Sequence, residues 1–188
     1  MNFLQIVALT CEKCGISGSG PASVVNQKGE YLRAVNGVNE AWEIIQKKNP
    51  HWDWMRLDFS FNTTVGLREY LPVAAGVTDL SEWHLDTLRC HNTAESVTTE
   101  QFMCDTDWAS FRDSYLFGAQ QLQAGRPHVF AIRPRGKALV FDYLPDAIYT
   151  IRGEYQQRAV RMAANGDVPA MPEQHHMAIV HRAVMLYA

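Results

Sequence analysis

The chain has 188 residues, of which 47% are hydrophobic and 20% are charged, and its formal net charge is −3. This balance is typical of a globular protein and argues against one that mainly grips nucleic-acid backbone, which would carry a strong basic excess. No apolar run approaches the ~20 residues of a membrane span, and the first ten residues lack the marks of a signal peptide. We therefore expect a soluble, intracellular, compact protein without a membrane partner.

The N-terminal part of the chain is predicted to be helical. Apolar residues at helical spacing indicate one helix over residues 3–14, ended by Gly15, and a second over residues 29–48. Residues 16–23 between them are rich in Gly and Ser and are expected to form turns. The buried stripe of the second helix is expected to comprise Leu32, Val35, Val38, Trp42 and Ile45.

Beyond residue 50 the apolar period changes from 3.6 to 2. Leu57, Phe59 and Phe61 alternate with polar residues, which predicts a strand with one buried face. Gly66 predicts a turn, after which residues 68–71 return as the second strand of a hairpin. Further strands are predicted over 87–91, 100–104, 128–132, 138–141 and 149–155, and a short amphipathic helix over 106–117.

The C-terminal part is predicted to be a tethered helix. Residues 163–169 form a polar connection that we expect to be flexible, and the helix begins at about Pro172, a residue suited to the first turn. The helix is apolar on two sides. One stripe is expected to pack on the protein's own helices, and the other then needs a further partner; this second stripe comprises Ile179, Ala183 and Leu186.

These elements predict an α+β fold, in which an N-terminal helical hairpin and a C-terminal helix pack with an inserted antiparallel β layer. The expected organisation has three parts. They are an N-terminal helical part over 1–50, a β-rich insertion over 51–160 with its short helix near 106–117, and a linker with the C-terminal helix over 161–188. The helices at both ends of the chain are expected to form one bundle.

The four cysteines allow two interpretations. Cys11 and Cys14 form C-x-x-C, which occurs in redox dithiols and as half of a zinc site, but here it lies at the end of a predicted helix, where the dipole raises a thiol pKa. Cys90 and Cys104 have thirteen residues between them, too many for a second zinc pair. We favour packing as small apolar side chains. A thiol or metal enzyme that uses Cys11 and Cys14 stays the alternative.

Other catalytic motifs are missing from the sequence. His175, His176 and His181 do not offer the i, i+4 spacing of a helical zinc pair. The chain has no nucleophile elbow, no phosphate-binding loop and no dinucleotide motif. We therefore predict no catalytic residue, no cofactor and no metal.

The segment Trp52-Asp53-Trp54 follows the second predicted helix. Two large rings at this point favour a core hinge that fastens the helix end to the sheet. The alternative is an interface anchor formed by Trp54 with Arg56, because Trp and Arg are enriched in binding hot spots.

The order of short motifs along nearly the whole chain resembles the tailed-bacteriophage head–tail adaptor family (connector, tail tubular protein A-like). No single motif is catalytic, so the resemblance rests on their succession. The motifs are Phe3-Leu4-Gln5, Gly15-Ile16-Ser17-Gly18-Ser19-Gly20-Pro21, Val38-Asn39-Glu40-Ala41-Trp42, Trp52-Asp53-Trp54-Met55, Phe59-Ser60-Phe61-Asn62, Gly125-Arg126-Pro127 and His176-Met177-Ala178-Ile179-Val180.

The resemblance implies a structural virion protein at the head–tail junction, synthesised in the host cytoplasm. It implies a homo-oligomeric, typically dodecameric ring that binds the portal protein and a tail or nozzle protein, while genomic DNA passes through the lumen without specific binding. A net negative charge repeated around a ring would repel phosphate and favour sliding. Another virion ring, a stopper or a tail terminator, stays an alternative. The expected partner-contact residues are Trp54, Arg56, Ile179, Arg182, Leu186 and Tyr187.

Overall fold

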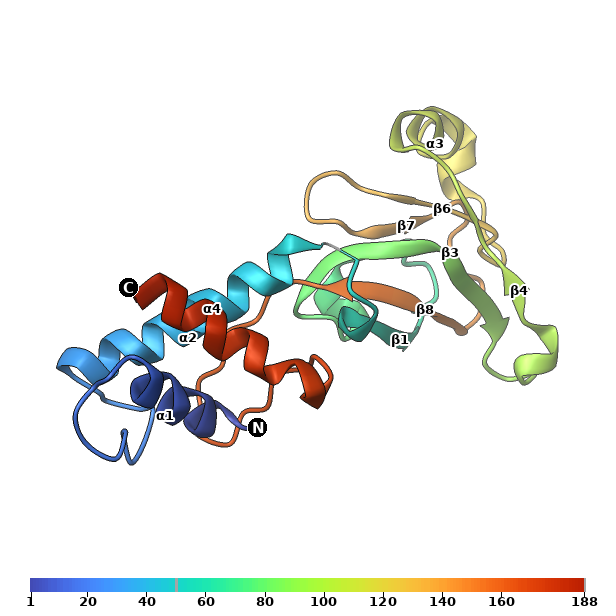
Figure 1. Cartoon of the computed structure of the whole chain (residues 1–188). Helices are drawn as coiled ribbons and strands as arrows, with labels where there is room; N and C mark the ends of the chain where they lie inside the picture. The colour runs from blue at the N-terminus through green and yellow to red at the C-terminus, as the bar shows by residue number, and fades with distance from the viewer. Residues whose placement is uncertain (50, 188) are drawn as a thin grey trace. The chain divides into compact units, whose positions relative to one another are not determined.

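The computed structural model describes residues 1–49 and 51–187, and it confirms the predicted α+β class (Figure 1). The helices are α1 (Phe3–Lys13), α2 (Gly29–Lys48), α3 (Trp108–Tyr115) and α4 (His176–Tyr187). The strands are β1 (Arg56–Asn62), β2 (Glu69–Tyr70), β3 (Leu80–Asn92), β4 (Gln101–Phe102), β5 (Cys104–Asp105), β6 (Val129–Ile132), β7 (Leu139–Phe141) and β8 (Tyr149–Gln157). Five short 3-10 helices join them in this part of the chain: Asp53–Met55, Pro72–Ala75, Val97–Thr99, Gly118–Leu122 and Glu173–His175.

The chain divides into two compact units. The helical unit comprises Met1–Met55 and Ala159–Ala188, and the β unit comprises Arg56–Arg158. Within the described ranges 1–49 and 51–187, none of the helices combines the length and the apolar character needed to cross a bilayer.

Helices α1, α2 and α4 pack together in the helical unit. Helix α1 begins with a capping box, in which the Asn2 side chain accepts a hydrogen bond from the Gln5 backbone N–H and the Gln5 side chain accepts one from the Asn2 N–H. The largest fully buried side chains of this core are Phe3, Ile6, Val7, Val38, Ile179 and His176. Leu32, predicted to be buried, is exposed on α2, because α4 and α1 cover only the face that carries Ala34, Val38 and Ala41.

The segment that leads into α4 is not the predicted flexible tether. The Asp167 carboxylate accepts hydrogen bonds from the N–H groups of Ala163 (2.6 Å) and Ala164 (2.8 Å), and the Asp167 carbonyl accepts one from Phe3 N (2.7 Å). The Asn165 side chain accepts another from Val24 N (2.7 Å). The expectation is therefore wrong, since these bonds tie the polar segment to α1 and to the loop before α2. Helix α4 itself begins at His176, after the 3-10 helix that follows Pro172.

The prediction that the second apolar stripe of α4 needs a further partner is also wrong. Ile179 and Ala183 are buried in the core of the helical unit, so they are not waiting for a partner. Leu186 remains exposed near the end of the helix. Because α4 packs against both α1 and α2, it buries a wider face than a single stripe.

The β unit consists of two four-stranded sheets instead of one β layer. Sheet A has the order β1-β8-β3-β4, and sheet B has the order β2-β7-β6-β5, with β5 and β6 parallel and the other pairs antiparallel. A shared core joins the two sheets. Its large members are Phe59, Trp83, Leu88, Ile151 and Tyr155 from sheet A, and Tyr70, Phe130, Leu139 and Phe141 from sheet B.

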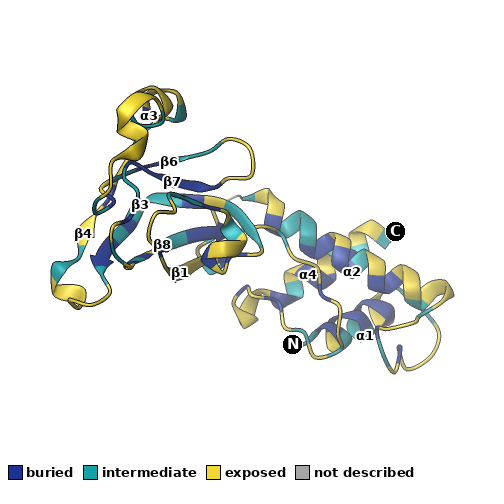
Figure 2. Cartoon of the chain, turned by 180° about the vertical axis from the view of Figure 1, so that it is seen from behind, coloured by how far each residue is buried: buried dark blue, intermediate teal, exposed yellow. Residues whose placement is uncertain are grey.

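Helix α3 packs on the other side of sheet B. Phe111 of α3 is fully buried against Ala131 and Val140, whose strand neighbours Phe130 and Leu139 belong to the core between the sheets. This alternation places successive side chains of β6 and β7 on opposite faces. Figure 2 shows β7 buried along its length and α3 largely exposed.

One strand prediction is wrong in its pairing, and two others differ from the structure in their bounds. β1 pairs with β8, 88 or more residues away along the chain, and not with residues 68–71, which enter sheet B as β2. The predicted strand 100–104 splits at buried Met103 into β4 in sheet A and β5 in sheet B. The predicted strand 87–91 is the end of the longer β3. For β1, pairing with a sequence-distant strand, and not a local turn, decides the outcome.

Candidate functional site

Trp54 is the centre of an aromatic stack in the helical unit. Its ring centroid lies 5.2 Å from that of Trp42 and 5.6 Å from that of Trp52. The indole N–H of Trp52 donates a hydrogen bond to the Ile45 carbonyl at 3.0 Å. Trp54 is half-buried against the helical core. Packing within the unit accounts for the buried part of the Trp54 ring. A role of Trp54 at a partner interface stays a prediction.

Arg56, the other member of the predicted anchor, belongs to the β unit. It forms an ion pair with Glu154 across the β1–β8 pair, and its side chain is exposed. The two residues of the anchor therefore fall in different units.

A groove of about 370 Å³ lies beside the end of α4, and it contains two of the predicted contact residues, Leu186 and Tyr187. The Tyr187 hydroxyl donates a hydrogen bond to Glu30, which raises the pKa of Tyr187, and the Arg33 guanidinium lies 4.7 Å from the Tyr187 ring centroid. Leu32 (42% exposed) and Leu186 (37%) give the groove an apolar part. Its remaining lining residues are Gly29, Asn36, Gly37 and Glu40.

Arg182, a further predicted contact residue, is half-buried on α4. Its Nε atom is buried and makes no hydrogen bond with any residue that the structure describes. Ile179 has no exposed surface, so the structure places it in the core of the subunit and not on a contact surface.

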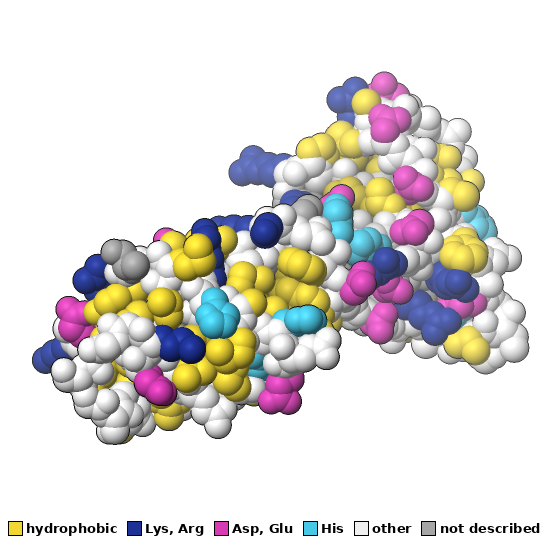
Figure 3. Space-filling model, viewed as in Figure 1, with side chains coloured by type: hydrophobic (Ala, Val, Ile, Leu, Met, Phe, Trp, Pro, Cys, Tyr) yellow, Lys and Arg dark blue, Asp and Glu magenta, His cyan; other side chains and the backbone are white. Residues whose placement is uncertain are grey.

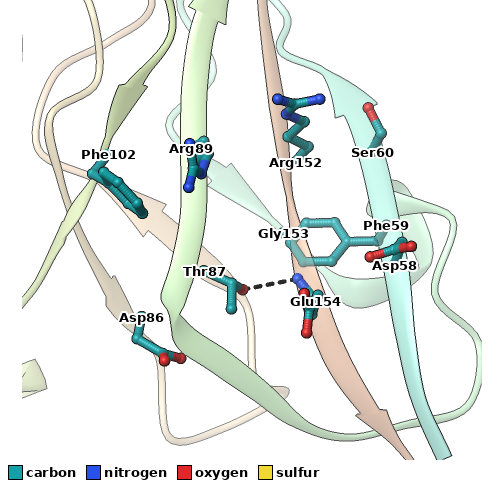
Figure 4. Close-up of a pocket in the computed structure, with 10 residues that line it drawn as sticks. All are labelled: Asp58, Phe59, Ser60, Asp86, Thr87, Arg89, Phe102, Arg152, Gly153 and Glu154. Atoms are coloured by element: carbon teal, nitrogen blue, oxygen red, sulfur yellow. Dashed lines mark hydrogen bonds between the residues drawn. The ribbon is translucent and has the colours of Figure 1, made fainter. Parts of the chain in front are cut away.

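The outer face of sheet A carries a second, larger hollow of about 680 Å³, which sequence reasoning missed (Figure 4). Strand register places Ser60, Arg152, Arg89 and Phe102 in one row across β1, β8, β3 and β4. Asp58 and Glu154 lie in the next row. Figure 3 shows acidic, basic and His side chains mixed over this region. The polar alternation in β1 and β8 was visible in the sequence, but the strand order that assembles it was not.

Glu100 connects the basic residues at one side of this hollow. Arg152 Nε lies 2.5 Å from a Glu100 carboxylate oxygen, Arg89 lies at 3.6 Å, and His91 lies at 3.8 Å. The hydrogen bond from Arg152 is the main reason that the pKa of Glu100 is lowered. Arg89 also lies over the Phe102 ring, 3.9 Å from its centroid. The two arginines of the hollow are therefore already engaged within the subunit.

The floor of the hollow is fixed by an irregularity in β3 and by a glycine in β8. The β3–β8 register shifts between His84 and Arg89, and Thr87 Oγ1 in the shifted segment accepts a hydrogen bond from Glu154 N at 2.9 Å. A Cβ at Gly153 would lie 3.2 Å from atoms of Leu88, Phe59 and Thr87. A side chain at this position would press on these three side chains, so glycine suits the close packing of the irregular segment on β8.

The cysteines do not form a common site. Cys11 and Cys90 are buried, Cys14 is half-buried at the end of α1, and Cys104 is exposed, so the core prediction is wrong for Cys104. Burial raises the pKa of Cys11 and Cys14, and it raises the pKa of Cys90 to about 11. Within residues 1–49 and 51–187, no group of three or more His, Cys, Asp or Glu side chains is placed to hold a metal ion.

The α+β fold therefore carries two open hollows, one on the helical unit and one on the β unit. The family model described as SU10 adaptor protein matches residues 20–188, and the chain belongs to this family. The resemblance to phage head–tail adaptors is thereby confirmed, and the protein is a structural adaptor of the bacteriophage virion. No curated protein matches the chain.

Proposed function

We propose that the protein forms a homo-oligomeric ring, a dodecamer, that joins the portal to the tail and surrounds the passage for genomic DNA. The observation that carries this proposal is the match to the SU10 adaptor family over residues 20–188. A ring subunit that also joins two different partners needs several distinct contact surfaces. The groove beside α4 and the hollow on sheet A supply two of them, one on each unit.

The groove beside α4 is the proposed portal contact. Leu186, with Leu32 across the groove, offers apolar surface, and Arg33 and Glu40 offer charges at its rim. An amphipathic helix or extended segment of the portal fits such a groove. Arg182 and Tyr187 belong to this proposed contact, and Trp54 and Arg56 stay proposed contacts of the ring or of the tail.

Passage of DNA is compatible with the charge of the chain. Each copy carries a net charge of −3, so a ring of such copies carries a multiple of that negative charge. A net negative ring disfavours tight binding of phosphate, which suits DNA that slides without being held.

The rival structural function is a stopper or a tail terminator, which would bind the tail tube and ignore the portal. The enzymatic rival needs a reactive Cys11 or Cys14. Their raised pKa values disfavour a thiolate at neutral pH, which argues against a thiol enzyme.

The test is co-sedimentation and electron microscopy of the purified protein with portal and with tail protein. We expect rings that bind both, and we expect Leu186→Glu to abolish portal binding while rings still form. Val168→Glu is the matched control, since Val168 is an exposed apolar residue of the same unit that lies outside the groove. Binding to the tail tube but not to the portal would establish the rival ring function instead.

A further inference from the structure

The hollow on sheet A contains two carboxylates that the subunit leaves unpaired. Glu154 is paired with Arg56, and Glu100 is paired with Arg152 and Arg89. Asp58 and Asp86 line the same hollow, and neither makes a hydrogen bond or ion pair with any residue that the structure describes. Figure 4 shows Asp58 on β1 and Asp86 on β3, on opposite sides of β8. The local charge left over is therefore negative, which favours a cation as the occupant.

An apolar surface lies beside these carboxylates. Phe102 is 60% exposed at the edge of sheet A, with Arg89 covering one face of its ring. An occupant of this hollow therefore needs a positive charge together with apolar side chains.

The β unit itself carries an exposed surface with this composition. Among its basic side chains, those of Arg135 and Arg158 alone make no hydrogen bond or ion pair with the part of the chain that the structure describes. Arg135 lies in the exposed turn between β6 and β7, where Gly136 has a φ of +82°. Leu71 packs beside Gly136, and both Leu71 (54%) and Val73 (71%) are exposed. We call Arg135, Leu71 and Val73 the arginine knob.

We propose that the arginine knob of one copy inserts into the sheet A hollow of the next copy, and that this contact builds the ring. Arg135 forms charge-assisted hydrogen bonds with Asp58 and Asp86, while Leu71 and Val73 cover Phe102. The knob and the hollow share no residue, and a contact in which each copy's knob enters the hollow of the next copy is heterologous. A heterologous contact repeated by rotation closes into a ring. This inference rests on the proposed ring function and names the surfaces that form it.

Charge reversal on each side gives a test in the full-length protein. One variant carries Asp58→Lys with Asp86→Lys, and the other carries Arg135→Glu. We expect each variant alone to lose ring assembly, with association weakened by about thirtyfold or more in analytical ultracentrifugation. The matched control is Glu95→Lys with Asp105→Lys, which makes the same charge change at exposed positions of the β unit outside the hollow. This control should assemble as the wild type does.

Mixing the two reversed variants is the decisive measurement. Each knob then meets a hollow of opposite charge only on the other variant, so native mass spectrometry should show rings that contain the two chains in equal numbers. Restored assembly also shows that both variants are folded. All three substitutions in one chain should likewise restore rings.

The results separate this inference from the ring proposal. If the wild-type protein forms no ring, alone or on purified portal, the proposed function fails. If the wild type forms rings and either reversed variant does too, the knob-and-hollow contact is wrong. Failure of the mixture to assemble also overturns it. Normal rings that no longer bind portal or tail protein would assign the hollow to that partner and overturn it as well.

Discussion

The side chain of Asn39 and the backbone of Met162, 123 positions apart, exchange two hydrogen bonds. Asn39 Nδ2 donates to the Met162 carbonyl at 3.0 Å, and Met162 N donates to Asn39 Oδ1 at 3.0 Å. Two turns further along α2, Gln46 makes the same pair of bonds with Val160, also at 3.0 Å. The two amides act like a neighbouring strand for the returning chain, so no backbone group of Met162 is left unsatisfied.

Replacing Asn39 tests how much its two hydrogen bonds with the Met162 backbone, here called the Asn39 clamp, contribute to stability. Asn39→Ala leaves a buried N–H and a buried carbonyl without partners, so we expect the free energy of unfolding to fall by about 2–4 kcal/mol. Asn36→Ala is the control, because Asn36 is exposed on the same helix. Chemical denaturation followed by tryptophan fluorescence measures both. An equal effect of the two substitutions would show that the clamp contributes nothing.

Substitution of Trp54 tests how much the aromatic stack with Trp42 and Trp52 contributes to stability. Trp54→Ala removes a half-buried ring and both of its stacked contacts, which should cost about 2–3 kcal/mol, less than the 3–5 kcal/mol of a fully buried ring. Trp54→Phe keeps part of the stack and should recover about half of the loss. A variant that keeps wild-type stability yet forms no rings would make Trp54 an interface anchor and contradict the packing role.

The cysteines should differ in reactivity according to burial. Cys104 is expected to react rapidly with a thiol reagent in the native protein and Cys14, half-buried and with a raised pKa, more slowly, while Cys11 and Cys90 react only on unfolding. Cys11→Ala should lower stability by about 1–2 kcal/mol and leave assembly intact, while Cys104→Ala should change neither. Mass spectrometry of the labelled protein checks the order. Rapid labelling of native Cys11, or loss of assembly without loss of stability, would revive the dithiol hypothesis.

Glu100 makes stability depend on pH in the acid range. Arg152 lowers the pKa of folded Glu100, so the unfolded chain binds the proton more readily. The stabilisation is therefore present above the unfolded pKa of about 4.3 and is lost as the pH falls through the lower folded pKa. Glu100→Gln should cost about 1–2 kcal/mol at neutral pH, since Arg152 stays partly solvated.

The comparison for Glu100 is Glu95→Gln, at an exposed position in the same connection between β3 and β4. Urea midpoints measured across the acid range should converge for the wild type and Glu100→Gln as the pH falls. Parallel curves for these two proteins would mean that Glu100 is not the titrating group.

Local patterns in the sequence determined the α+β class and most helix and strand positions. The stripe Val35, Val38 and Trp42 marks the buried face of α2, and the alternation of Tyr149, Ile151 and Tyr155 marks that of β8. These features follow from periodicity along a single element, which a sequence carries directly. The adaptor family was equally readable, because it rests on the order of motifs and not on their contacts.

Only the tertiary structure decided which elements pair and which surfaces stay open. The sequence of β1 predicts one half of a local hairpin, but β1 pairs with β8. Its core-facing residues Phe59 and Phe61 pack against side chains from strands that are distant in the sequence. The polar segment before α4 reads as a tether, yet Asn39, Asn165 and Asp167 fix it through hydrogen bonds. Pairing energy depends on partners far along the chain, whereas periodicity is local, so the hollow on sheet A emerges only when the strands are assembled.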